Sequence, residues 1–143
     1  MKWCQDLEIA KIRLFENNLT LSIVKSSKVV FESRSHGIGG FLEAIEKSGD
    51  KMMGASVADK VVGKAVALLC VYAGVRAVYA GTLSIEAKTV FERNGIYLET
   101  GKIVDKILDR SGREMCPFEK ASLKIDSSEE AYRKFKALMN LLR

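Results

Sequence analysis

The chain has 143 residues and a formal net charge of +5, from 23 basic and 18 acidic residues. Hydrophobic residues make up 48% and charged residues 29%, which is typical of one globular domain, and the length is too short for two of ordinary size. The basic residues are interleaved with acidic ones instead of gathering on one element, which argues against nucleic-acid binding. We therefore expect a single domain over 1–143, with a helical N-terminal extension over 1–18 and a C-terminal helix over 128–142.

The sequence lacks the segments expected of an exported or membrane protein. No basic-then-apolar leader opens the chain, and the longest apolar run, 65–73, is far shorter than the ~20 residues that span a bilayer. Cys4, Cys70 and Cys116 are odd in number and form no CxxC pair, which favours reduced thiols. We expect a cytoplasmic protein with no membrane partner, and a homo-oligomer is left open.

The N-terminal third predicts a helix and a hairpin. Residues 6–18 place apolar side chains at roughly helical spacing. Two short runs rich in β-branched residues, 19–25 and 28–33, flank Ser26-Ser27 and predict a β-hairpin.

A long apolar segment follows. After a glycine-rich loop and a short helix over 41–47, residues 54–74 (GASVADKVVGKAVALLCVYAG) are apolar on nearly every side beyond their first polar groups. The pattern predicts one helix that ends at Gly74 and is enclosed by other elements.

The remaining chain alternates strands with helices. Ser84 and Gly95 suit the two ends of one predicted helix, and Pro117 suits the first position of another. A hairpin followed by β-α-β crossovers builds a mixed sheet with helices on its faces, so the expected fold class is α/β. The predicted elements are strands over 75–80 and 96–100 and helices over 84–95, 102–115 (with a turn at Ser111-Gly112), 116–125 and 128–142.

The polar start of the 54–74 segment has two interpretations. Ser56 and Asp59 match a capping box, which would be purely structural. Lys60 and Lys64 lie four residues apart, so they share a helix face, and free amides beside two lysines would attract an anion. The pattern is not a P-loop, because the spacing of its glycines and hydroxyl residue is wrong.

Lys64 and Gly63 also bear on whether this segment start is structural or binds a ligand. Lys64 is the only charged residue between Val61 and Ala73, so its ammonium must pair with Asp59 or another carboxylate, or reach a cleft. Glycine inside a helix costs about 1 kcal/mol relative to alanine, so Gly63 indicates that a backbone or a ligand packs closely there.

Four stretches, KVVFES, GIGGFLEAI, GASVADKVVGKAVALL and MCPFEKASL, resemble an uncharacterised bacterial and archaeal domain family. That family is grouped with the cytidine-deaminase-like fold, and the resemblance covers roughly residues 19–125. It implies a three-layer α/β/α sandwich, which agrees with the element order.

The resemblance does not extend to the zinc site. Zinc deaminases carry H/C-A-E at the start of the core helix and P-C-x-x-C at the next helix. Laid on this chain, Val57, Glu86 and Thr89 stand in place of the three ligands, and Asp59 stands in place of the catalytic Glu. We therefore expect no metal and no other cofactor, and no deaminase chemistry.

The glycine loop holds the remaining candidates. His36 and Gly37 belong either to a solvated loop or to an anion-binding nest over the mouth of the long helix. Cys116 is either a thiolate at a helix start or a small buried residue.

The predicted function is binding of a small anionic or nucleotide-like ligand, with enzymatic activity undecided. The alternative is a non-catalytic binding or assembly module. The candidate catalytic residues are Asp59 and Lys64, and the candidate ligand-binding residues are Ser56, Lys60, His36 and Gly37.

Overall fold

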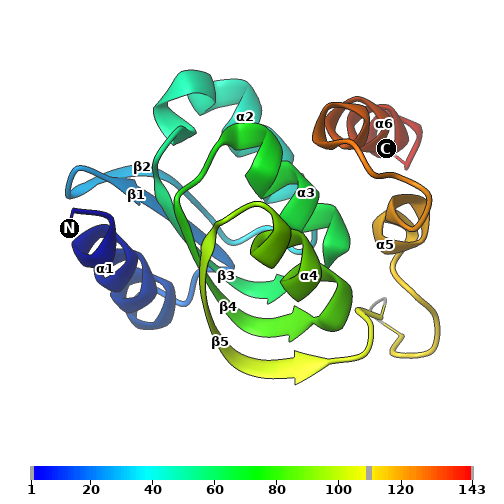
Figure 1. Ribbon diagram of the computed structural model, residues 1–143, viewed down its shortest axis with the longest axis horizontal. Helices are drawn as coiled ribbons and strands as arrows, with labels where there is room; N and C mark the ends of the chain where they lie inside the picture. Colours follow the sequence, from blue (N-terminus) through cyan, green and yellow to red (C-terminus); the bar gives the residue numbers. More distant parts are fainter. Residues whose placement is uncertain (1, 109–110, 143) are drawn as a thin grey trace.

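The computed structural model describes residues 2–108 and 111–142 and has the predicted α/β fold (Figure 1). The elements are α1 (Lys2–Glu16), β1 (Leu21–Lys25), β2 (Lys28–Ser33), α2 (Gly39–Ser48), the 3-10 turn η1 (Gly49–Met52), β3 (Ser56–Val62), α3 (Lys64–Ala73), β4 (Ala77–Ser84), α4 (Ile85–Arg93), β5 (Tyr97–Val104), α5 (Pro117–Ser122) and α6 (Ser128–Leu142).

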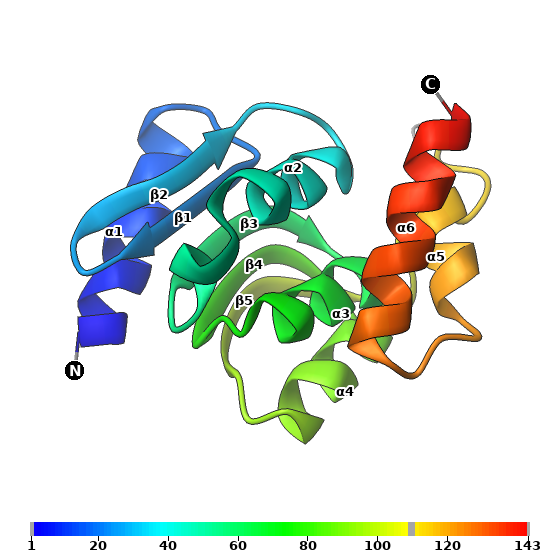
Figure 2. The same ribbon diagram turned by 90° about the horizontal axis from the view of Figure 1, so that it is seen from above.

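A five-stranded mixed sheet forms the middle layer, in the order β2-β1-β3-β4-β5. Strand β1 is antiparallel to β2 and β3, whereas β3, β4 and β5 are parallel to one another. Helix α1 packs on one face, while α2, α3 and α4 cover the other (Figures 1 and 2). Helices α5 and α6 contact α3 beyond the end of the sheet to which the parallel strands point.

The buried apolar side chains form two clusters, one on each face of the sheet. The larger cluster lies between the sheet and helices α2 to α6 and contains the buried residues of α3, from Ala65 to Cys70. The smaller one lies under α1. Helix α3 is therefore enclosed, as its uniformly apolar sequence predicts.

The predicted hairpin is confirmed. Ser26 and Ser27 both have positive φ, 53° and 65°, which suits the tight turn between β1 and β2. The carboxylate of Asp6 on α1 accepts hydrogen bonds from both serine N–H groups, at 3.0 Å and 2.8 Å. This buried acidic group therefore fixes the turn against α1.

The single helix predicted over 54–74 is wrong. Residues 56–62 form strand β3, Gly63 is extended with φ −105° and ψ −174°, and only then does α3 begin at Lys64. Three valines favour a strand here, and pairing with β1 and β4 decides between the two conformations. The capping box predicted from Ser56 and Asp59 therefore does not exist.

The helix predicted over 102–115 is also wrong. Strand β5 continues to Val104 along β4, and Leu108 pairs with Met115 in an isolated antiparallel bridge. Residues 109 and 110 of that prediction lie outside the described part of the chain.

The predicted ends of α4 are confirmed. The buried Ser84 Oγ accepts a hydrogen bond from Ala87 N–H at 3.1 Å, and Gly95 follows the C-cap with φ 66°.

We expect Ser84→Ala to lower the free energy of unfolding by about 1 kcal/mol, because a buried N-cap acceptor is removed. Urea denaturation measures the change. Thr89→Ala, an exposed hydroxyl on the same helix, is the control and should change stability by less than about 0.5 kcal/mol. Equal effects of the two substitutions would show that the cap contributes nothing specific.

Candidate functional site

A cavity of ≈ 470 Å³ lies at the carboxyl end of β3, between the N-termini of α2 and α3. Ligand sites in open α/β sheets form at the carboxyl ends of the strands, because loops and helix N-termini converge there. Most of the wall comes from four segments: residues 35–41, 59–66, 107–108 and 116–119. We call it the β3 pocket.

Four of the six predicted site residues line the β3 pocket: His36, Gly37, Asp59 and Lys60. His36 and Gly37 are exposed in the loop before α2, and Lys60 is exposed at the end of β3. The Lys60 ammonium donates a hydrogen bond to Asn18 Oδ1 at 3.2 Å.

The other two predicted residues are not on its wall. Ser56 is fully buried near the start of β3, and its hydroxyl donates to the Trp3 carbonyl at 2.8 Å. Lys64 is half-buried at the first position of α3. Of the pairings predicted for Lys64, the one with Asp59 is wrong, because no ion pair within 4.0 Å joins these two described residues.

Asp59 is the unusual group in this pocket. Desolvation raises its pKa to about 7, although the backbone N–H groups of Val61 and Lys60 oppose the shift. The Val61 N–H donates to Asp59 Oδ1 at 3.3 Å. A carboxyl group with this pKa is present in both protonation states at neutral pH, so it can donate or accept a proton.

The N-terminus of α3 is occupied by the protein itself. The carboxylate of Glu119, on α5, accepts hydrogen bonds from Lys64 N–H at 3.0 Å and Ala65 N–H at 2.8 Å. Burial raises the Glu119 pKa, while these two N–H groups and the Lys64 charge oppose the rise. The anion predicted at this helix mouth is therefore a side chain of the same chain.

Gly63 explains how the Glu119 carboxylate fits. A Cβ atom built on Gly63 would lie 2.3 to 2.4 Å from three atoms of that carboxyl group. The sequence correctly predicts close packing against Gly63, but it places Gly63 inside a helix and does not identify Glu119 as the group that packs there. Fifty-five residues separate Glu119 from Lys64, so no local sequence pattern indicates their contact.

The residues laid on the zinc motifs do not form a ligand set. Val57 is buried in β3, and Glu86 and Thr89 are exposed on α4. The match of 57–59 to the start of a helix is wrong, because these residues belong to a strand. Within 2–108 and 111–142, no group of three or more His, Cys, Asp or Glu side chains could hold a metal ion.

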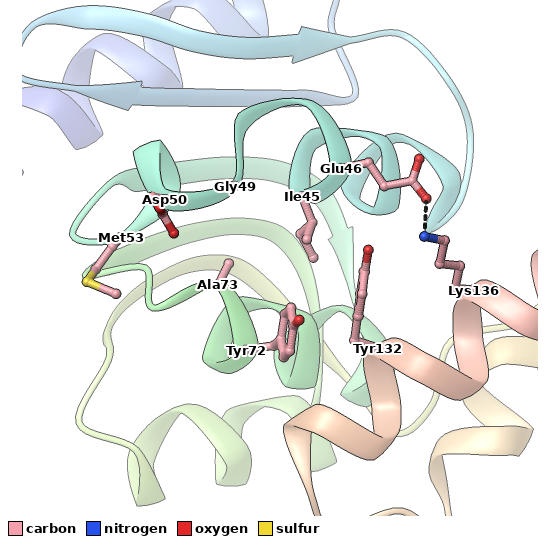
Figure 3. Close-up of a pocket in the computed structure, with 9 residues that line it drawn as sticks. All are labelled: Ile45, Glu46, Gly49, Asp50, Met53, Tyr72, Ala73, Tyr132 and Lys136. Carbon is pink, nitrogen blue, oxygen red and sulfur yellow. Dashed lines mark ion pairs between the residues drawn. The ribbon is translucent and has the colours of Figure 1, made fainter.

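A second cavity, of ≈ 590 Å³, opens on the surface between α2, η1, α3 and α6 (Figure 3). Tyr72 and Tyr132 stack there with ring centroids 4.5 Å apart. Lys136 on α6 reaches across to Glu46 on α2, at 3.3 Å. These two charges neutralise each other, so we regard the β3 pocket as the better candidate.

The fold and pocket define an α/β domain with a candidate ligand site at the carboxyl end of its parallel strands. The chain belongs to the TM1506 family, a domain of unknown function (DUF1893), whose model matches residues 9–139. This confirms the predicted membership of an uncharacterised family. None of the described helices is long and apolar enough to cross a bilayer.

The fold is shared with a crystal structure of the DUF1893 family protein TM1506 from Thermotoga maritima. The two are 28% identical with a TM-score of 0.86, over 93% of this chain and 89% of the other. Two forms of Acinetobacter baumannii RibD also match, with 19% identity and TM-scores of 0.46 and 0.48, over 69% and 70% of this chain and 34% of theirs. No curated protein matches the sequence significantly.

Proposed function

We propose that this protein binds a small nucleotide-like ligand in the β3 pocket. The observation that carries the proposal is Asp59, which lines a cavity at the carboxyl end of β3 and forms no ion pair with a basic side chain of the residues that the structure describes. A desolvated carboxyl group without a basic partner lowers the stability of the folded protein. Polar groups that lower stability in this way are concentrated at functional sites.

The pocket wall supports a planar ligand. Its volume falls within the range of ~300–1,000 Å³ typical of small-molecule sites. Apolar side chains make up much of the wall and would pack against the faces of a ring: Ile38, Phe41, Val66, Leu108 and Phe118. A few polar groups would then set the orientation of the ligand.

An anionic part of the ligand would lie at the rim. The N–H groups that begin α3 already bind Glu119, so a phosphate is not expected there. Lys60 and the loop of His36 and Gly37 are exposed beside the pocket and could contact a phosphate instead. Proton transfer by Asp59 is the chemistry that this site can supply.

We expect at least one of cytidine, adenosine, CMP and AMP, at millimolar concentration, to raise the melting temperature of the wild type. A ligand at 100 times its Kd adds about 2.7 kcal/mol of stability. Asp59→Asn should lose this shift, and Glu46→Gln, in the second cavity, should keep it. A shift that survives Asp59→Asn, or no shift with any of the four compounds, would contradict the proposal.

The alternative, an assembly module, is supported by one observation. Strand β5 is an edge strand, and Tyr97 and Ile103 on it are 42% and 48% exposed. An exposed apolar edge can pair with a second copy of the chain. Sedimentation velocity that finds a stable dimer, together with a negative ligand screen, would favour this function.

A further inference from the structure

Several acidic side chains are fully or partly buried, and their charges are stabilised in different ways. A carboxylate removed from water must be protonated or must receive hydrogen bonds or a cation. Asp6 receives two N–H groups of the hairpin turn, and Glu119 receives two from the start of α3. Glu32 pairs with Arg13, and Glu99 pairs with Lys11.

Asp59 has no comparable partner in the described part of the chain. Among the residues that the structure describes, no Lys, Arg or His nitrogen lies within 4.0 Å of its carboxylate. The ammonium of Lys60, the next residue, donates a hydrogen bond to Asn18, and Lys64 forms no ion pair with another described residue. Within 2–108 and 111–142, the donors to this carboxyl group are the backbone N–H groups of Val61 and Lys60, and the hydrogen bond from Val61 is long, at 3.3 Å.

The β3 pocket is the cavity in which a cationic group of a ligand could lie beside Asp59. Asp59 belongs to its wall, together with the rings of Phe41 and Phe118. A cation that enters this space would be desolvated on its faces by apolar side chains and would meet a carboxylate at its edge. A planar cation with two parallel N–H donors suits both features, because it can bind a carboxylate through two hydrogen bonds.

We propose that Asp59 anchors a planar cation of the amidinium or guanidinium class as the polar edge of the ligand in the β3 pocket. The inference rests on the proposed function and specifies the charge of the group that enters. When Asp59 is protonated before binding, the carboxyl O–H bond breaks and the proton passes to the buffer. The resulting carboxylate then pairs with the cation, whose own protons stay in place.

The raised pKa of Asp59 makes this exchange measurable. Below pH 7 the free pocket holds the proton, so binding of a cation must release it. Above pH 8 the carboxylate is already ionised, and binding releases almost none. An uncharged ligand of the same shape has no such effect.

The test uses three compounds of nearly the same shape and different charge: benzamidine, benzamide and benzoate. Isothermal titration at pH 8 should show that wild-type protein binds benzamidine at least tenfold more tightly than benzamide, and benzoate most weakly. Asp59→Asn should abolish the preference for the cation. Asp50→Asn removes an exposed carboxylate beside the second cavity and should retain it.

Proton release provides a readout that needs no variant. Titration of wild-type protein with benzamidine at pH 6, in two buffers of different ionisation enthalpy, should show about one proton released per molecule bound, falling to almost none at pH 9. Weak or equal binding of all three compounds, or a preference lost in Asp50→Asn and kept in Asp59→Asn, would overturn the inference. If nucleosides bind through Asp59 while benzamidine binds no better than benzamide, the proposed function stands and the inference fails.

Discussion

Replacing Gly63 with alanine should lower the free energy of unfolding by about 2 kcal/mol, although alanine is the better residue for most chain positions. The new Cβ would lie 2.3 Å from the carboxyl carbon of Glu119. That carboxylate would have to leave the N–H groups of Lys64 and Ala65, and a hydrogen bond to a charged group contributes about 1.5–3 kcal/mol. The lower chain entropy of alanine in the unfolded state returns only about 0.4–1 kcal/mol.

A double-mutant cycle separates this contact from any general effect of alanine. Once Glu119→Ala has removed the carboxylate, Gly63→Ala should be neutral or slightly stabilising, so the coupling between the two sites is about 2 kcal/mol. The φ of Gly63, −105°, is open to alanine. Gly39→Ala is the control, because its Cβ would meet only the flexible end of Met139, at 3.3 Å. The same cost of Gly63→Ala with and without Glu119 would refute the contact.

The elements that the sequence predicts correctly are those with local signals. The hairpin turn at Ser26-Ser27, the Ser84 cap and the Pro117 helix start each depend on residues within a few positions of one another. In the 54–74 segment Gly74 correctly marks the end of a helix, but the start is misleading. Ser56 and Asp59 match a helix cap, and a run rich in valine and alanine suits a strand as well as an enclosed helix. Parallel pairing with β4 makes residues 56–62 a strand, and pairing is a property of the whole sheet.

The sequence predicts some of the residues that line the candidate pocket, but it places them in the wrong secondary structure. Asp59 and Lys60 were placed at the start of a helix, and they lie instead near the end of a strand that leads into one. The start of such a helix and the end of such a strand both lie at the carboxyl end of the parallel strands. The two residues therefore line a pocket in either case. Glu119 was missed because its partners are separated from it by 54 and 55 residues of chain.

Asp59→Asn should stabilise the protein at alkaline pH, by an amount that depends on pH. The Asp59 pKa is about 7 in the folded protein and near 3.8 when the chain is unfolded. Between these values the folded state binds more protons, so the contribution of Asp59 to stability falls as pH rises from about 4 through 7. A difference of about three pKa units corresponds to about 4 kcal/mol.

Asparagine keeps an acceptor for the Val61 N–H and cannot ionise, so it avoids this loss. We expect the variant to exceed the wild type by about 3 kcal/mol at pH 8.5 and to match it within about 1 kcal/mol at pH 4.5, as measured by urea denaturation across this range. Other acids also titrate: burial raises the Glu119 pKa, while Arg13 lowers that of Glu32. They are present in both proteins, so they cancel in the difference between the two curves. A difference that does not change with pH would show that Asp59 is ionised throughout, and the pocket would then hold an ordinary solvated carboxylate.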